Sequence, residues 1–166
     1  MNPDVISALD GLMIWSDASW KVELNYAGFV IFFANAAIDW QSKLLKVMLS
    51  SAEAEVGAGA LACKRSIYLR HLIGEVTPLP ALPIPHIVDH SALPPLSENL
   101  GVSRKTEHFR RWLHFMRYCV LHNYTYVHLT RSEYMLADSL SSRRLKTSMA
   151  SYHSYLKAVF NITSFK

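Results

Sequence analysis

Acidic side chains recur in this chain at positions where a buried segment ends or where a helix begins. Two of them follow apolar runs directly, and the others fall in the first turns of expected helices. If the chain brings these carboxylates together, divalent cations must cancel their mutual repulsion. Two such cations about 3.5–4 Å apart form the clamp that enzymes use for in-line phosphodiester chemistry. The acids are Asp17, Glu53 or Glu55, Asp89 and Asp138.

Each of these acids also has a purely structural interpretation. Asp17 fits a turn that leaves the core, and Asp89 fits the cap of a short helix that follows it. Glu53, Glu55 and Asp138 fit favourable charges at helix N-termini. Because Glu53 and Glu55 lie about 200° apart around a helix axis, only one of them can face a sheet. The local sequence leaves the choice between them open.

Hydropathy predicts five strands that would position the acids. The first, Leu12–Trp15, is apolar on both faces and is therefore expected to be buried on both sides. Turns at 21–25 and 35–37 join the first three strands into a meander, although residues 44–49 could also be helical. The later strands are predicted at Tyr26–Ala34, Ile38–Met48, Ile84–Val88 and Tyr124–Leu129.

The predicted helices begin with a capping box, in which Ser50 is followed three residues later by Glu53. Alanine and glycine fill the first half of that helix, so it can approach a sheet closely. Four prolines at 77–85 predict an extended connector, and two more at 94–95 exclude a long helix there. The helices are expected from Ser50 to about Ile73, Thr106 to Asn123, Met135 to Leu145, and Met149 to Phe160.

Composition narrows the class of protein. The chain has 166 residues, 51% of them hydrophobic, and a net charge of +4, which suits a single domain with a mildly basic surface and a polyanionic partner. Cys63 and Cys119 form no C-x-x-C motif, so we expect two buried packing residues and a reducing compartment. No secretory signal precedes the first strand, and the longest apolar run, 27–38, is too short to span a membrane. We therefore expect a cytoplasmic or nuclear protein.

Six short motifs occur in one order along residues 12–142. Their sequences are W-S-D-A-S-W at 15–20, I-D-W-Q-S-K at 38–43, L-S-S-A-E-A-E at 49–55 and V-D-H-S-A at 88–92, then His108, His114, Phe115 and Arg117 on one helix, and L-A-D-S-L at 136–140. Together they resemble the ribonuclease H domain of copia-type LTR retrotransposon polyproteins (reverse transcriptase/ribonuclease H). That family has Y-S-D-A-D-W, I-S-W-x-S-K, L-S-S-T-E-A-E, C-D-N-Q-S-A, H-I-D-I-R-Y-H-F-I-R and L-A-D-x-L at the corresponding places.

The resemblance implies an α/β, ribonuclease H-like fold over residues 1–146. Its five-stranded mixed sheet would combine a three-strand antiparallel meander with two parallel strands, flanked by helices. Residues 147–166 would form a C-terminal helical extension packed on the same domain. By its motifs, the resemblance favours Glu55 over Glu53. It implies two Mg²⁺ ions, with Mn²⁺ as a substitute, and the catalytic metal ligands Asp17, Glu55, Asp89 and Asp138.

The same resemblance implies an endonuclease that cleaves the RNA strand of RNA–DNA hybrids beside the reverse transcriptase and integrase regions of a parent polyprotein. The alternatives are a repurposed, non-catalytic module that binds nucleic acid or protein, and another nuclease of the same fold, against which the acid order argues. The chain departs from the family at His90, which replaces Asn, and at Arg110, which replaces Asp. Nucleic-acid contacts are expected from Ser19, Ser51, Ser91, Arg104, Lys105, His108 and Arg111.

Overall fold

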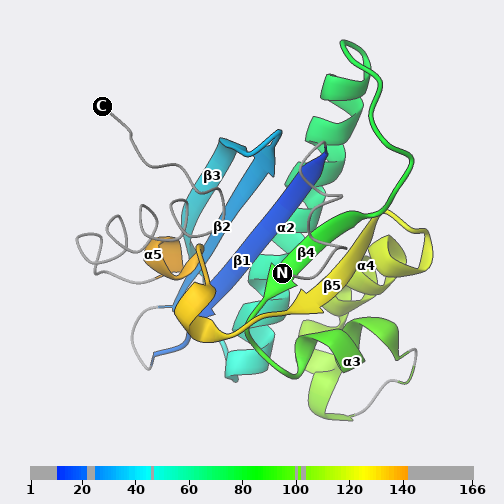
Figure 1. Cartoon of the computed structure of the whole chain (residues 1–166). Helices are drawn as coiled ribbons and strands as arrows, with labels where there is room; N and C mark the ends of the chain where they lie inside the picture. The colour runs from blue at the N-terminus through cyan, green and yellow to red at the C-terminus, as the bar shows by residue number, and fades with distance from the viewer. Residues whose placement is uncertain (1–10, 22–24, 46, 100, 102–103, 142–166) are drawn as a thin grey trace.

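Five strands form one mixed sheet in the order β3-β2-β1-β4-β5 (Figure 1). The computed structural model describes residues 11–21, 25–45, 47–99, 101 and 104–141. The first three strands pair antiparallel, whereas β4 runs parallel to both β1 and β5. The fold class predicted from the sequence is confirmed. The strands are β1 (Leu12–Ser19), β2 (Asn25–Phe33), β3 (Ala36–Leu45), β4 (Ile84–Val88) and β5 (Thr125–Leu129).

Helices cover both faces of this sheet. The long helix α2 and the helix α4 pack on one face, and the short helix α5 lies on the other (Figure 1). Ser50 caps α2, since its side chain accepts a hydrogen bond from the Glu53 backbone N–H, as the capping box predicts. The helical segments are α2 (Ser51–Gly74), α3 (Leu93–Glu98), η2 (Arg104–Phe109), α4 (Arg110–Leu121), η3 (Ser132–Tyr134) and α5 (Asp138–Ser141).

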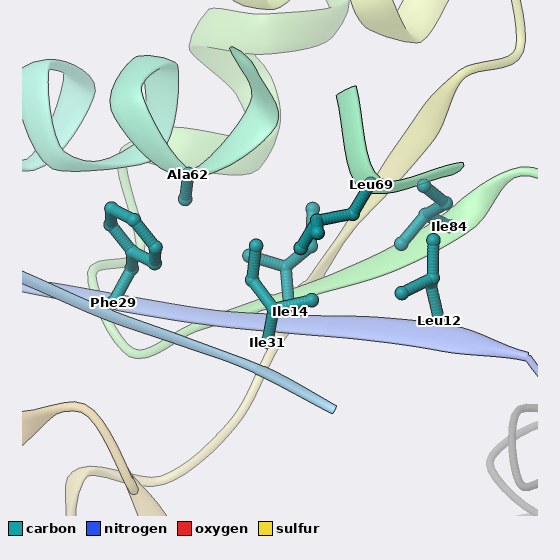
Figure 2. Packing of buried hydrophobic residues seen from close by; sticks show 7 residues of the cluster. All are labelled: Leu12, Ile14, Phe29, Ile31, Ala62, Leu69 and Ile84. Atoms are coloured by element: carbon teal, nitrogen blue, oxygen red, sulfur yellow. The ribbon is translucent and has the colours of Figure 1, made fainter. Parts of the chain in front are cut away.

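The main core lies between α2 and the sheet. Small residues on the first half of α2 let its backbone come close to its neighbours. A Cβ atom added at Gly59 would stand 2.9 Å from the Cε atom of Met116 on α4. Figure 2 shows the cluster formed by two residues of α2 and five of β1, β2 and β4, namely Ala62, Leu69, Leu12, Ile14, Phe29, Ile31 and Ile84.

A second cluster buries the opposite face of the same strands. Met13 and Trp15 of β1 pack there against Met135 and Ala137, which lead into α5. β1 is therefore buried on both sides, as its apolar run predicts. The Asp17 carboxylate, near the end of this strand, therefore lies between two covered faces and is largely buried.

The hairpin between β2 and β3 differs from the prediction. A turn at 35–37 was expected, but Ala34 and Asn35 alone make it, with φ angles of 47° and 65°. A two-residue loop of this kind matches the twist of an antiparallel hairpin, so β3 begins at Ala36 rather than at residue 38. The strand ends at Leu45, which excludes a helix at residues 44–45.

Other boundaries also shifted. The prolines at 94–95 stand in the first turn of α3, where a missing N–H costs nothing, so the short helix that the sequence left open after Asp89 forms. Its N-cap is Ala92 and not Asp89. A 3₁₀ segment precedes α4, whose α-helical part starts at Arg110. α5 starts at Asp138 rather than Met135. The helix expected at 149–160, and with it the extension at 147–166, lies outside the described residues. No helix within the described ranges is long and apolar enough to cross a membrane.

Candidate metal centre

Three of the predicted acids meet at one edge of the sheet. Asp17 lies near the end of β1, Asp89 follows β4, and Glu55 projects from the first turns of α2. Each offers a carboxylate oxygen, and these oxygens all lie within 4.8 Å of one another. Because β1 and β4 are parallel neighbours, their carboxyl ends fall on the same edge, which is where open α/β sheets place ligands.

The side chains of Glu55 and Glu53 have different surroundings. Glu55 is only 5% exposed; its Oε1 accepts a hydrogen bond from the Ala18 N–H at 3.3 Å. Its buried Oε2 has no hydrogen-bond partner within the structure described. The partly buried Glu53 accepts a hydrogen bond from the Leu49 N–H at 2.6 Å, and its Oε2 lies 3.4 Å from Nε2 of His108. The helix therefore turns Glu55, and not Glu53, toward the other acids.

Burial and repulsion disfavour the charged forms of this group. Burial raises the pKa of Asp17 to about 6, and the nearby charges of Asp89 and Asp138 raise it as well, while a hydrogen bond from Ser141 lowers it. Burial, reinforced by Asp17 and Asp89, raises the pKa of Glu55 to about 9. A divalent cation would reverse both effects, because it favours ionised oxygen ligands. The unpartnered Glu55 oxygen and the close acids fit such a cation.

Asp138 stands apart from the three acids. It is the first residue of α5, its side chain is exposed, and it does not belong to the group whose oxygens lie within 4.8 Å of one another. The charge of Asp138 nevertheless raises the pKa of Asp17, so Asp138 lies near enough to repel the Asp17 carboxylate. Asp138 therefore stands at the rim of the cluster.

The serines expected to contact nucleic acid belong to the same three segments as the acids. Ser19 ends β1 and accepts a hydrogen bond from the Tyr26 N–H at 3.1 Å. Ser51 is exposed at the start of α2, and its Oγ lies 3.5 Å from Nε2 of His90. Ser91 is exposed in the turn just after Asp89. All three are therefore close in sequence to one of the acids.

The basic residues expected to contact nucleic acid lie on η2 and α4. His108 and Arg111 line an open pocket of about 610 Å³ together with Glu107, Arg110, Trp112 and His114. The contact of His108 with Glu53 places this pocket beside the N-terminus of α2. The backbones of Arg104 and Lys105 belong to η2, but their side chains lie outside the described residues. Cationic, aromatic and imidazole groups together suit a nucleic-acid backbone.

Sequence reasoning missed two residues of the site. Ser141 on α5 is 2% exposed and donates a hydrogen bond to the Asp17 carboxylate. His90 accepts a hydrogen bond from the Ala92 N–H through Nδ1 at 3.3 Å, which leaves Nε2 to donate to Ser51. The substitution at His90 was visible in its motif, but no sequence pattern marked Ser141 as a partner of Asp17.

Comparisons with known proteins give a fold-level answer. No family model matches the chain, and no curated protein matches it. Among solved structures, ribonuclease H1 from the halophilic archaeon Halobacterium salinarum is similar, with a TM-score of 0.61 and 11% identity over 78% of this chain and 92% of that one. The N-terminal ribonuclease H domain of a Mycobacterium tuberculosis protein is also similar, with a TM-score of 0.62 and 11% identity over 87% of this chain and 97% of that one. The structure of LC11-RNase H1 in complex with an RNA/DNA hybrid has a TM-score of 0.62 and 12% identity over 78% of this chain and 92% of that one. Strand order, acid placement and these similarities identify the fold of this chain as ribonuclease H-like.

Proposed function

We propose that the chain is a ribonuclease H, an endonuclease that hydrolyses the RNA strand of RNA–DNA hybrids. The observation that carries this proposal is the convergence of Asp17, Glu55 and Asp89, with one buried Glu55 oxygen left without a partner among the described residues. Burying such a group is unfavourable unless a ligand compensates it. The similar structures support the same assignment, since they are ribonucleases H.

Asp17, Glu55 and Asp89 would hold the cations, and Asp138 would join them from the rim as the fourth ligand. When bound, two Mg²⁺ ions, or Mn²⁺ in their place, supply activation of water and stabilisation of charge at the scissile phosphate. The chain itself contributes orientation. The parallel strands β1 and β4 place the carboxylates of Asp17 and Asp89 side by side. The helix α2 brings Glu55 to them, and the Ala18 N–H donates a hydrogen bond to one of its oxygens.

The pocket on η2 and α4 would bind the backbone of the hybrid. Arg111 and His108 can pair with phosphates, and Trp112 offers a ring for contact with sugar or base. His108 also contacts Glu53, two residues before Glu55, so a strand held in the pocket would run beside the acids. The RNA/DNA hybrid in the LC11-RNase H1 complex supports this class of substrate.

The biological setting that we propose is a copia-type retrotransposon. The six motifs of that family run along residues 12–142 in the family's order, and they carry all four acids. In that setting the domain would act during reverse transcription, next to the reverse transcriptase and integrase regions of the same polyprotein.

The test is cleavage of an RNA–DNA hybrid that carries a label on each strand, with Mg²⁺ and with EDTA. We expect cuts in the RNA strand only, lost in EDTA and in Asp89→Asn. Asp39→Asn is the matched control. Asp39 lies on the outer strand β3, away from the acid cluster, and forms an ion pair with Arg65 of α2. Hybrid binding without cleavage by the wild-type chain would refute the nuclease and favour a repurposed binding module.

A further inference from the structure

The helix α5 rests directly on the backbone of the sheet. A Cβ atom added at Gly28 of β2 would lie 2.7 Å from the carbonyl carbon of Leu140 and 2.7 Å from the backbone nitrogen of Ser141. Cβ atoms do not approach backbone atoms this closely, so only glycine admits α5 at this position. A second tether comes from β3, where the Ser42 hydroxyl donates to the Leu140 carbonyl oxygen at 2.5 Å.

This docking carries Ser141 to the acid cluster. Its hydroxyl donates to the Asp17 carboxylate and also lies 3.1 Å from the Asp138 carbonyl oxygen. One hydroxyl proton serves one acceptor at a time, and a carboxylate is a stronger acceptor than a carbonyl. Ser141 is 2% exposed and Asp17 7%, so water competes little for this bond.

Asp17 needs such a partner because two acidic neighbours repel it. The charges of Asp89 and Asp138 both act on its carboxylate, and a Glu55 oxygen also lies within 4.8 Å of it. A carboxylate has two oxygens, so a donor on one of them can fix the group while the other faces the remaining acids. Partners of this kind orient metal ligands in many sites.

We propose that Ser141 is a positioning residue for Asp17, and that Gly28 and Ser42 form the seat that keeps Ser141 in place. This inference rests on the proposed function, since it assigns Asp17 to a cation. It gives α5 a second task beyond presenting Asp138. Ser141 itself need not touch the cation or the substrate.

The first test measures Mn²⁺ binding by calorimetry, without substrate. We expect Ser141→Ala to weaken Mn²⁺ binding roughly tenfold, and Ser141→Thr, which keeps the hydroxyl, to bind close to wild type. Ser97→Ala is the matched control, because Ser97 is equally buried and donates only to the Pro94 carbonyl oxygen of α3, at 2.8 Å. Unchanged Mn²⁺ affinity in Ser141→Ala would overturn the proposal.

A second readout needs no metal. The side-chain rotamer of Asp17 can be followed by NMR coupling constants in the metal-free protein, with thermal unfolding as a check that each variant folds. We expect Asp17 to keep one rotamer in the wild type and in Ser141→Thr, but to populate several in Ser141→Ala. A single unchanged rotamer in Ser141→Ala would refute the positioning role. Failure of the wild-type chain to bind Mn²⁺ would refute the proposed metal site instead, and the Asp17 rotamer would then decide the role of Ser141.

Discussion

Replacing Glu55 by Gln should stabilise the metal-free protein and abolish its response to Mg²⁺. Glu55 is 5% exposed, and its Oε2 has no partner within the part of the chain that the structure describes. A neutral amide of nearly the same shape needs no added proton when it is buried, so it avoids the cost of neutralising Glu55. The same change removes an oxygen ligand that a cation requires, so stability and metal binding should move in opposite directions.

The magnitude follows from the pKa of Glu55. Burial raises this pKa from its ordinary 4.5 to about 9, so the folded chain holds a proton that the unfolded chain releases between these pH values. The resulting stability is complete below pH 4.5 and is lost as the pH rises through 9. The slope is about 1.4 kcal/mol per pH unit, which gives about 3 kcal/mol between pH 7 and pH 9 as an upper limit.

The window from pH 7 to pH 9 isolates Glu55 from its neighbours. Asp17, with a pKa of about 6, loses its contribution at lower pH. Burial lowers the pKa of His86 to about 4, so its effect has the opposite sign and is confined to the range between 4 and its ordinary 6.5. Groups that titrate in both proteins cancel when the variant is compared with the wild type.

The assay is urea unfolding in EDTA at pH 7, 8 and 9, followed by tryptophan fluorescence. We expect the stability advantage of Glu55→Gln to widen by about 1–3 kcal/mol across this range. Glu98→Gln, the same change at an exposed residue of α3, should track the wild type. Millimolar Mg²⁺ should raise the melting temperature of the wild type and not that of Glu55→Gln. Parallel pH profiles for wild type and Glu55→Gln would refute the reasoning, since they would mean that Glu55 folds as a hydrated charge.

Three further predictions concern close contacts and the basic pocket. Gly28→Ala should cost about 1–3 kcal/mol in urea unfolding and also weaken Mn²⁺ binding, because its Cβ displaces α5; a variant with normal Mn²⁺ affinity would contradict this. Gly59→Ala should cost less, about 1 kcal/mol, because its Cβ meets the flexible end of Met116 at 2.9 Å and Cε1 of His86 at 3.1 Å. It should leave Mn²⁺ affinity intact, because neither side chain belongs to the acid cluster. Arg111→Ala should weaken hybrid binding and reduce the salt slope in anisotropy titrations by about 1; an unchanged slope would exclude a phosphate contact.

Short-range patterns in the sequence determined the elements and most of their order. The capping box that starts α2 involves Ser50 and Glu53, three residues apart, and any chain with that pattern favours a helix start. The two-sided burial of β1 follows from its unbroken apolar run. Boundaries were less predictable where turns decided them, as at Ala34 and Asn35, because alanine rarely adopts the left-handed backbone that Ala34 has here.

Only the tertiary structure decided how the acids are used. α2 could have turned either Glu53 or Glu55 to the sheet, and its packing buries Glu55. Asp138 falls at the rim rather than in the close group. The bond from Ser141 to Asp17 joins residues 124 positions apart. Local sequence sets backbone preferences and side-chain faces, but the distance between such remote groups depends on how whole elements dock. That docking is a property of the packed core, and no short stretch of the chain contains it.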